Sequence, residues 1–376
     1  MDLRDSPAEA EFRAELREWL GRTLPELPAR PHRDDWEGRR RFDTDWQRRL
    51  FEAGYAGLDW PEAYGGRGAS PTETLVFLEE MARADAPNVG VNFVGLLHAG
   101  PTLIAEASDE QKAAHLPRIL RGEEVWCQGF SEPEAGSDLA SLRCRAERDG
   151  DDYVITGQKI WTSFAQVADQ CELLVRTDTE AQKHRGITWL ILSMDTPGIE
   201  VRPLRTAVGS SEFSELFLDE VRVPVANRVG DENDGWRVAM VTFSFERGTS
   251  LVGEMLETRQ MLEEMRGLIG DDPDHRRRLG RLIAEMDGLW ALTKRTVSEA
   301  DATGVPGVGG SVGKLLYTEL CQRIGDLALS LLDADRLSLD ERWVDERLRV
   351  LALTIAAGTS QIQRNIIGER VLGLPR

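Results

Sequence analysis

The sequence predicts an α+β chain of three consecutive domains: a helical domain, a β domain and a helical bundle. Apolar residues recur at helical spacing in the first third of the chain. The spacing changes to strand-like alternation in the middle, and helical spacing returns from Asn233 onward. We place the domains at residues 1–122, 123–229 and 230–376, with a barrel or sandwich in the middle domain.

The helices of the first domain follow from apolar spacing and from residues that begin helices. Pro71 stands at a favourable first-turn position, because the N–H that proline lacks is not needed there. A Pro-rich segment at 24–31 and a Gly-rich segment at 54–70 predict loops. The expected helices cover residues 8–20, 42–53, 71–84, 89–107 and 109–120.

The middle domain is predicted from period-two segments and one clear hairpin. Residues 142–147 alternate between apolar and charged, Asp149-Gly150 supplies a tight turn, and residues 153–155 begin the return strand. The turn folds the chain back, so the segments at 130–138 and 161–163 can lie at the same end of neighbouring strands. Further strands are expected at residues 172–176, 186–192 and 214–223.

The third domain is predicted to be a helical bundle that ends in a capped helix. Its helices are expected at residues 236–268, 275–301, 311–333, 341–351 and 360–372. Ser360 and Gln363 have the spacing of a capping box, and Gly373 and Pro375 predict the end of the last helix.

Composition limits the classes of partner. The 376 residues include 65 acidic and 46 basic side chains, giving a net charge of −19, which disfavours nucleic acid. The apolar runs are too short for a membrane span, and the N-terminus lacks the apolar core of a signal peptide. Four widely spaced cysteines predict a reducing, cytoplasmic location. The five histidines show no metal-ligand spacing, so no metal is expected.

Three segments resemble the acyl-CoA dehydrogenase family of flavoproteins. They are SEPEAGSD at 131–138, GQKIWTS at 157–163 and AAGTSQIQRNIIGERVLG at 356–373. The resemblance implies an FAD enzyme that oxidises an acyl-CoA or acyl-carrier thioester to the trans-2-enoyl thioester. It also implies an electron-transfer flavoprotein as the electron acceptor and a homodimer or homotetramer as the assembly.

The resemblance assigns five residues of the middle domain to the flavin. Trp161 would stack near the isoalloxazine, beside Phe130, while the hydroxyls of Ser131 and Ser163 would hydrogen-bond its edge. Gln128 stands where the family often has an aromatic residue. The alternative interpretation is a strand-end aromatic with ordinary turn serines.

Further contacts are implied near the C-terminus and in the first motif. Thr359 and Gln361 would contact FAD, at a helix start whose free N–H groups favour phosphate. The backbone N–H of Ala357 would hold the thioester oxygen, and Ser137 would touch CoA or pantetheine. The plainer interpretation of this helix start is capping by Ser360 and Gln363, and that of Ser137 is a turn cap beside Gly136.

Glu246 is the candidate catalytic base. Its own helix face carries small, largely uncharged residues, and no Lys or Arg lies three or four positions away. A solvated surface glutamate is the ordinary alternative. The resemblance favours the base, because Ala357 stands where most members carry the catalytic carboxylate. A minority similar to isovaleryl- and long-chain acyl-CoA dehydrogenases carry Glu before Arg, as in Glu246-Arg247. Arg247 would then line the substrate pocket.

Two departures from the family concern FAD contacts shared between subunits. DDPDHRRRLGRL at 271–282 lacks the usual Arg-x-x-Phe-Gly, and LLDADRLSLDERW at 331–343 replaces a Gly-Gly-x-Gly segment. One alternative is therefore a heteromeric dehydrogenase whose partner chain completes the site. Another is an oxidase or monooxygenase of the same fold. GVGGSVGK at 307–314 lacks the spacing of a phosphate loop and predicts only a lead into a helix.

Overall fold

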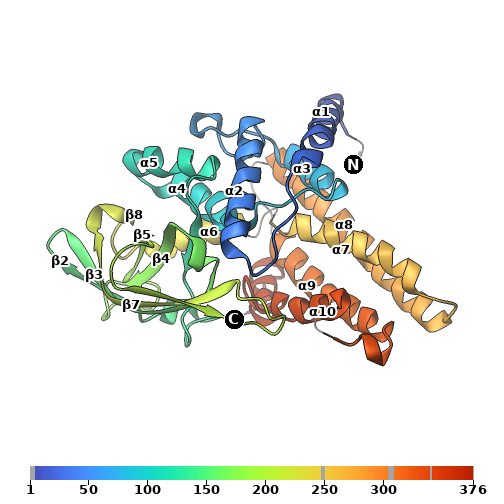
Figure 1. Cartoon of the computed structure of the whole chain (residues 1–376). Coiled ribbons are helices and arrows are strands. Elements are labelled where there is room, and N and C mark those ends of the chain that lie inside the picture. The colour runs from blue at the N-terminus through green and yellow to red at the C-terminus, as the bar shows by residue number, and fades with distance from the viewer. Residues whose placement is uncertain (1–4, 247–249, 304–308, 339–340, 376) are drawn as a thin grey trace.

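The computed structural model describes residues 5–246, 250–303, 309–338 and 341–375. The side chains of four residues lie outside that description, namely Glu246, Ser250, Ala302 and Thr303. A helical N-terminal part, a sheet and a C-terminal helical bundle follow one another along the chain, which confirms the predicted fold class (Figure 1). Within the described residues, no helix combines the length and apolarity needed to cross a membrane.

Helices α1, α3 and α5 of the N-terminal part begin where serine side chains cap them. Ser6, Ser70 and Ser108 each accept a hydrogen bond from the backbone N–H three residues later, and each is answered by a Glu or Gln side chain. The helices are α1 (Pro7–Thr23), α2 (Trp36–Glu52), α3 (Pro71–Arg83), α4 (Gly100–Glu106) and α5 (Asp109–Leu120). A π-helical turn, Gly95–Ala99, leads directly into α4.

One eight-stranded sheet forms the middle of the chain, in the order β6-β7-β3-β2-β4-β5-β8, with β1 paired to β4. The β2–β3 hairpin confirms the predicted turn at Asp149-Gly150. The strands are β1 (Trp126–Gly129), β2 (Arg145–Asp149), β3 (Asp152–Ser163), β4 (Gln170–Arg176), β5 (Ile187–Ser193), β6 (Ile199–Leu204), β7 (Phe213–Pro224) and β8 (Arg228–Val229). The expected strands omitted β1, β6 and β8.

Strands β4 and β5 are buried on both faces. Leu174, Trp189 and Ile191 join the core of the N-terminal helices, whereas Leu173 and Leu190 point into the core of the sheet itself. Strands covered on both sides read as continuous apolar runs, as these two do. The N-terminal helices therefore pack against one face of the sheet.

The C-terminal bundle is built from α7 (Ser250–Leu268), α8 (Pro273–Thr303), α9 (Gly309–Ser330) and α10 (Arg342–Leu353), followed by α11 (Ser360–Ile366). The sequence predicts one helix over 236–268. The structure describes α6 (Gly235–Glu246) and α7, and residues 247–249 between them lie outside the described residues. Helix α6 packs on the sheet, because Val238 and Ala239 belong to the core that contains Trp189.

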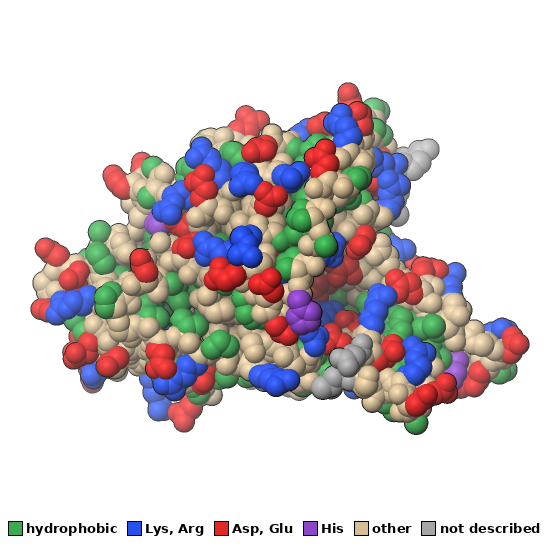
Figure 2. Space-filling view, viewed as in Figure 1, with side chains coloured by type: hydrophobic (Ala, Val, Ile, Leu, Met, Phe, Trp, Pro, Cys, Tyr) green, Lys and Arg blue, Asp and Glu red, His purple; other side chains and the backbone are tan. Residues whose placement is uncertain are grey.

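Side-chain charges are intermingled over the face of the molecule that Figure 2 shows. Acidic and basic groups alternate there without a continuous patch of one sign, although the net charge is −19. The same face is hollowed where the N-terminal helices meet the C-terminal bundle. The acidic excess is therefore spread over this face, where it offers no concentrated basic surface to an extended polyanion.

Candidate functional site

Trp161 lies at a bulge near the end of β3. The β3–β7 register shifts between Lys159 and Thr162, and a bulge of this kind redirects a side chain out of the sheet. Trp161 has φ +61°, a left-handed conformation that is rare for a bulky residue. Its indole is 58% exposed and meets the Phe213 ring edge-on, with centroids 5.9 Å apart. The sheet thus presents a wide, open aromatic face at this point.

The Phe130–Ser131 loop lies beside β3, as the hairpin predicted. The backbone N–H of Ile160 donates to the Ser131 carbonyl at 2.9 Å. The fully buried Lys159 ammonium donates to the Phe130 carbonyl at 3.3 Å and to Glu132 Oε1 at 2.8 Å. Sequence reasoning missed Lys159 and Glu132 as supports of this loop. The signal that could have revealed them is that oppositely charged residues stand inside the segments at 131–138 and 157–163.

The carboxylate of Glu132 is held on its other side by backbone donors. It accepts hydrogen bonds from the N–H groups of Arg143 at 2.6 Å and Cys144 at 2.9 Å. A buried ion pair persists when such further hydrogen bonds satisfy it. The loop that carries Phe130 and Ser131 is therefore fixed from β3 and from the segment that leads into β2.

Gln128 is oriented by a fully buried carboxylate. Its Nε2 donates to Glu172 Oε1 at 2.7 Å, and that oxygen lies 4.0 Å from Nδ1 of His98 in the π-helical turn. Burial lowers the pKa of His98 to about 4, so the imidazole is neutral near pH 7. The predicted flavin contact at Gln128 thus rests on a polar layer between β1, β4 and the N-terminal helices.

Ser137 lies on an exposed turn. The next residue, Asp138, accepts a hydrogen bond from Ser141 Oγ at 2.6 Å and pairs with Lys183 at 2.5 Å. The Lys183 ammonium is the main cause that lowers the pKa of Asp138. This turn is accessible to a ligand, and a basic residue from the β4–β5 loop stands beside it.

The loop between α10 and α11 has a left-handed backbone at Ala357 (φ +52°) and Gly358 (φ +87°). The capping prediction is wrong by one residue. Thr359 is the N-cap, and its hydroxyl accepts from the Ile362 N–H at 3.2 Å. Ser360 is buried inside the first turn instead, because the left-handed pair turns the chain into the helix one residue earlier. Gln361 is exposed.

Glu246 is the last residue of α6, and neither its side chain nor Arg247 lies within the described residues. The helix itself is well placed. The ring of Phe243, one turn before Glu246, meets Phe130 edge-on with centroids 5.9 Å apart. Thr242 Oγ1 also contacts Thr102 Oγ1 of α4 at 2.9 Å. The end of α6 therefore adjoins the loop of the predicted flavin contacts.

Arg33 connects the sheet end that carries Trp161 to helix α10. It lies in the segment between α1 and α2, and it donates to the Val208 carbonyl at 2.8 Å and to Asp345 at 2.6 Å. Glu212 follows in the same β6–β7 loop, and its carbonyl accepts from the Phe164 N–H at 2.7 Å. Burial raises the pKa of the Glu212 carboxyl, against the opposing charges of Arg39 and Arg349.

These residues fit the flavin that the resemblance implies. Trp161 offers an open indole face, and Ser131 and Ser163 each have a partly exposed side chain that carries a hydroxyl. Within the described part of the chain, the Ala357 N–H has no acceptor and remains available to a ligand. A flat aromatic group with hydrogen-bonding edges suits this set.

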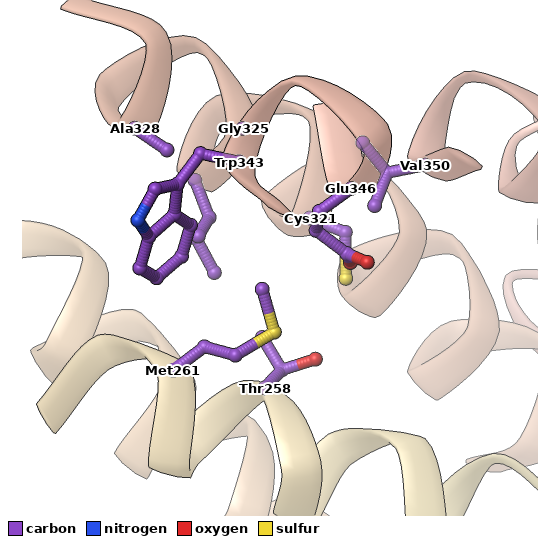
Figure 3. A pocket seen from close by; sticks show the side chains of 9 residues that line it. Thr258, Met261, Cys321, Gly325, Ala328, Trp343, Glu346 and Val350 are labelled. Atoms are coloured by element: carbon purple, nitrogen blue, oxygen red, sulfur yellow. The ribbon is translucent and has the colours of Figure 1, made fainter. Parts of the chain in front are cut away.

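A small enclosed cavity lies elsewhere, inside the bundle between α7, α9 and α10. Figure 3 shows Trp343 and Met261 on two sides of it, with Thr258 and Cys321 nearby. Its volume of about 10 Å³ leaves room for roughly one water molecule. Burial raises the pKa of Cys321 to about 12, so its thiol stays neutral. This cavity is a packing gap and is too small for a substrate.

Comparisons with known proteins cover almost the entire chain. Residues 6–123, 127–221 and 233–372 match the N-terminal, middle and C-terminal domains of acyl-CoA dehydrogenase, respectively. The chain is 41% identical to acyl-CoA dehydrogenase IpdE1 of Mycobacterium tuberculosis, over 97% of this chain and 98% of that protein.

Two solved structures share the fold along its whole length. The "Tcur3481-Tcur3483 steroid ACAD" aligns with a TM-score of 0.85 and 32% identity, covering 100% of both chains. The ChsE4-ChsE5 complex from Mycobacterium tuberculosis aligns with a TM-score of 0.84 and 34% identity, again covering 100% of both chains.

Proposed function

The chain belongs to the acyl-CoA dehydrogenase family, and we propose that Glu246 is its catalytic base. Members of this family are FAD-dependent oxidoreductases that act on CH–CH groups, and the chain has their fold throughout. The contact between Phe130 and Phe243 carries the proposal, because it sets the last turn of α6 beside the flavin-contact loop. Ala357 has no carboxylate to take a proton.

In the proposed reaction the residues of this chain bind, orient and deprotonate an acyl thioester. The Ala357 N–H donates to the thioester carbonyl oxygen, which stabilises enolate character and acidifies the α-proton. Glu246 removes that proton as general base. FAD, when bound, would supply the acceptor for the hydride that leaves the β-carbon. Trp161 orients the flavin ring, and Ser131 and Ser163 hydrogen-bond its edge.

Other contacts complete the proposed site. Thr359 and Gln361 contact FAD, Gln128 adjoins the flavin, and Ser137 contacts the CoA or carrier arm. Arg247 lines the substrate pocket. An electron-transfer flavoprotein takes the electrons away, as the resemblance implies.

Replacing Glu246 with Gln tests the base. Flavin should remain bound, while the rate of anaerobic flavin bleaching by an acyl-CoA should fall by roughly 10²- to 10⁴-fold, the usual contribution of a general base. Glu263→Gln, on the exposed surface of α7, serves as the matched control and should bleach at the wild-type rate. Wild-type bleaching by the Glu246→Gln variant would remove Glu246 from this role.

A heteromeric dehydrogenase is the second candidate. Both solved neighbours above are named as pairs of different chains. The present chain also lacks the Phe-Gly and Gly-Gly segments with which family members share FAD between subunits. Under this hypothesis the purified chain is colourless and acquires flavin only with a second acyl-CoA dehydrogenase chain. Visible spectra, with straight-chain and steroid acyl-CoA thioesters as substrates, distinguish the two assemblies. A yellow, active homomer would reject the heteromer.

A further inference from the structure

Lys314 on α9 is a buried cation that the proposed function leaves unused. It ends the segment GVGGSVGK, which does not have the spacing of a phosphate loop. The side chain is only 3% exposed, and its Nζ donates to the carbonyl of Gly358 at 2.7 Å. A buried ammonium is costly unless oxygen acceptors surround it. Its contact with Gly358 therefore indicates a specific structural purpose at the α10–α11 loop.

Gln363 of α11 makes a second tether to the same loop. It is fully buried, and its Nε2 donates to the carbonyl of Ala357 at 3.1 Å. A Cβ added at Gly358 would lie 2.8 Å from that Nε2, so the loop and the amide are closely packed. Two side chains from different helices thus hold two consecutive carbonyls, at Ala357 and Gly358.

The tethered backbone is strained. A residue other than glycine is strained in the left-handed region and persists there only where the surroundings determine it. Ala357 is such a residue, with φ +52°. The direction of its N–H depends on this conformation, and among the described residues that N–H has no acceptor.

We propose that Lys314 is a positioning residue that, together with Gln363, sets the Ala357 N–H for the thioester carbonyl oxygen. This inference rests on the proposed function. Lys314 does not touch the substrate and acts through the Gly358 carbonyl. Without its ammonium the loop can relax out of the left-handed conformation, and the N–H then loses its alignment with the oxygen.

Lys314→Met and Lys314→Arg in the flavin-loaded protein test the proposal. The probe is a 3-ketoacyl-CoA, which the dehydrogenation does not consume and whose bound enolate has its own ultraviolet absorption. A donor on the thioester oxygen lowers the pKa of the bound ligand. In Lys314→Met that pKa should rise by about one unit, a tenfold weaker preference for the enolate. Arginine keeps the charge and the donor, so Lys314→Arg should restore most of the shift.

Steady-state kinetics give a second readout. Lys314→Met should lower kcat by on the order of tenfold while KM changes less, since the lost alignment matters most in the transition state. Lys112→Met, a lysine that lies over Tyr64 in the N-terminal part, is the control and should match wild type. An unchanged ligand pKa and an unchanged kcat in flavin-loaded Lys314→Met would overturn the proposal.

If Lys314→Met does not retain its flavin, a second variant still tests the proposal. Gln363→Met then decides, because it removes the donor to Ala357 without removing a buried charge. It should raise the ligand pKa in the same direction, and an unchanged value would overturn the proposal. Failure of the proposed function is distinguishable, because the wild-type protein itself would then neither bleach with acyl-CoA nor ionise the bound ligand.

Discussion

Two buried polar side chains beside the site behave differently. One stays charged and binds a backbone carbonyl, and the other is buried in its neutral form. Lys159 is surrounded by acceptors, the Phe130 carbonyl and Glu132, and so keeps its charge inside the sheet. His98 is different. Its Nδ1 has no hydrogen-bond partner in the described part of the chain, and burial alone lowers its pKa to about 4. One residue thus fixes a loop, and the other makes stability depend on pH.

The pH dependence at His98 has a definite sign. Its pKa is about 4 in the folded protein against an ordinary 6.5, so between these values the unfolded chain binds more protons. Folding stability therefore falls as pH drops from about 6.5 to about 4, by about 2 kcal/mol between pH 8 and pH 5. Urea unfolding of wild type and His98→Gln at both pH values measures this. The variant should lose less stability than wild type over that interval, and equal losses would contradict the assignment.

Two short segments determine the site at the scale of single elements, and the sequence predicts them unequally. The β2–β3 hairpin follows from Asp149-Gly150 and the alternation around it. The bulge before Thr162 does not, because only the pairing with β7 reveals the shift in register. Strand β6 was also missed. It is an edge strand that contains Pro203, and a proline inside so short a run argues against a strand.

The start of α11 shows the same limit. Thr359 and Ser360 are adjacent hydroxyl residues, and either is an acceptable N-cap by composition. The choice depends on the left-handed backbone at Ala357 and Gly358, which depends in turn on Lys314 from another helix. Local sequence carries no record of that contact. The sequence therefore shows a lysine at position 314, but only the structure shows that it contacts the loop before α11.

Paired substitutions at the start of α11 test which hydroxyl caps the helix. Thr359→Ala should destabilise the protein by about 1 kcal/mol, the usual cost of losing an N-cap. Ser360→Ala should have almost no effect, because Ser360 Oγ is buried with no hydrogen-bond partner among the described residues. Denaturant unfolding measures both, and Thr359→Ser should retain the cap. A larger loss in Ser360→Ala than in Thr359→Ala would restore the original capping prediction.

At the scale of the whole molecule, the site depends on contacts between distant parts of the chain. Arg40 of α2 pairs with Asp169 at 2.7 Å, which also accepts from the Val125 N–H at 2.8 Å. Arg237 of α6 pairs with Glu106 of α4 at 2.6 Å. The order of the helical, β and helical parts followed from periodicity. These cross-links did not, because their partners stand more than a hundred residues apart and no local pattern joins them.

Arg33 is the cross-link that bears most directly on flavin binding. It joins the β6–β7 loop, at the sheet end that carries Trp161, to α10, which leads into Ala357 and Thr359. Partly exposed ion pairs contribute at most about 1 kcal/mol, so Arg33→Met should leave global unfolding almost unchanged. The sheet end that carries Trp161 and the segment that carries Ala357 and Thr359 would nevertheless move more freely. Ordering them when FAD binds would then cost more conformational entropy.

We therefore expect Arg33→Met to release FAD several-fold faster than wild type, measured by flavin fluorescence after dilution, with little change in the free energy of unfolding. Arg22→Met is the control, since Arg22 forms an exposed pair with Glu18 inside α1. Unchanged FAD release from Arg33→Met would show that the sheet and the bundle hold the flavin without this link. An equal loss of stability and of flavin would instead make Arg33 a general support of the fold, because a local link affects binding before it affects unfolding.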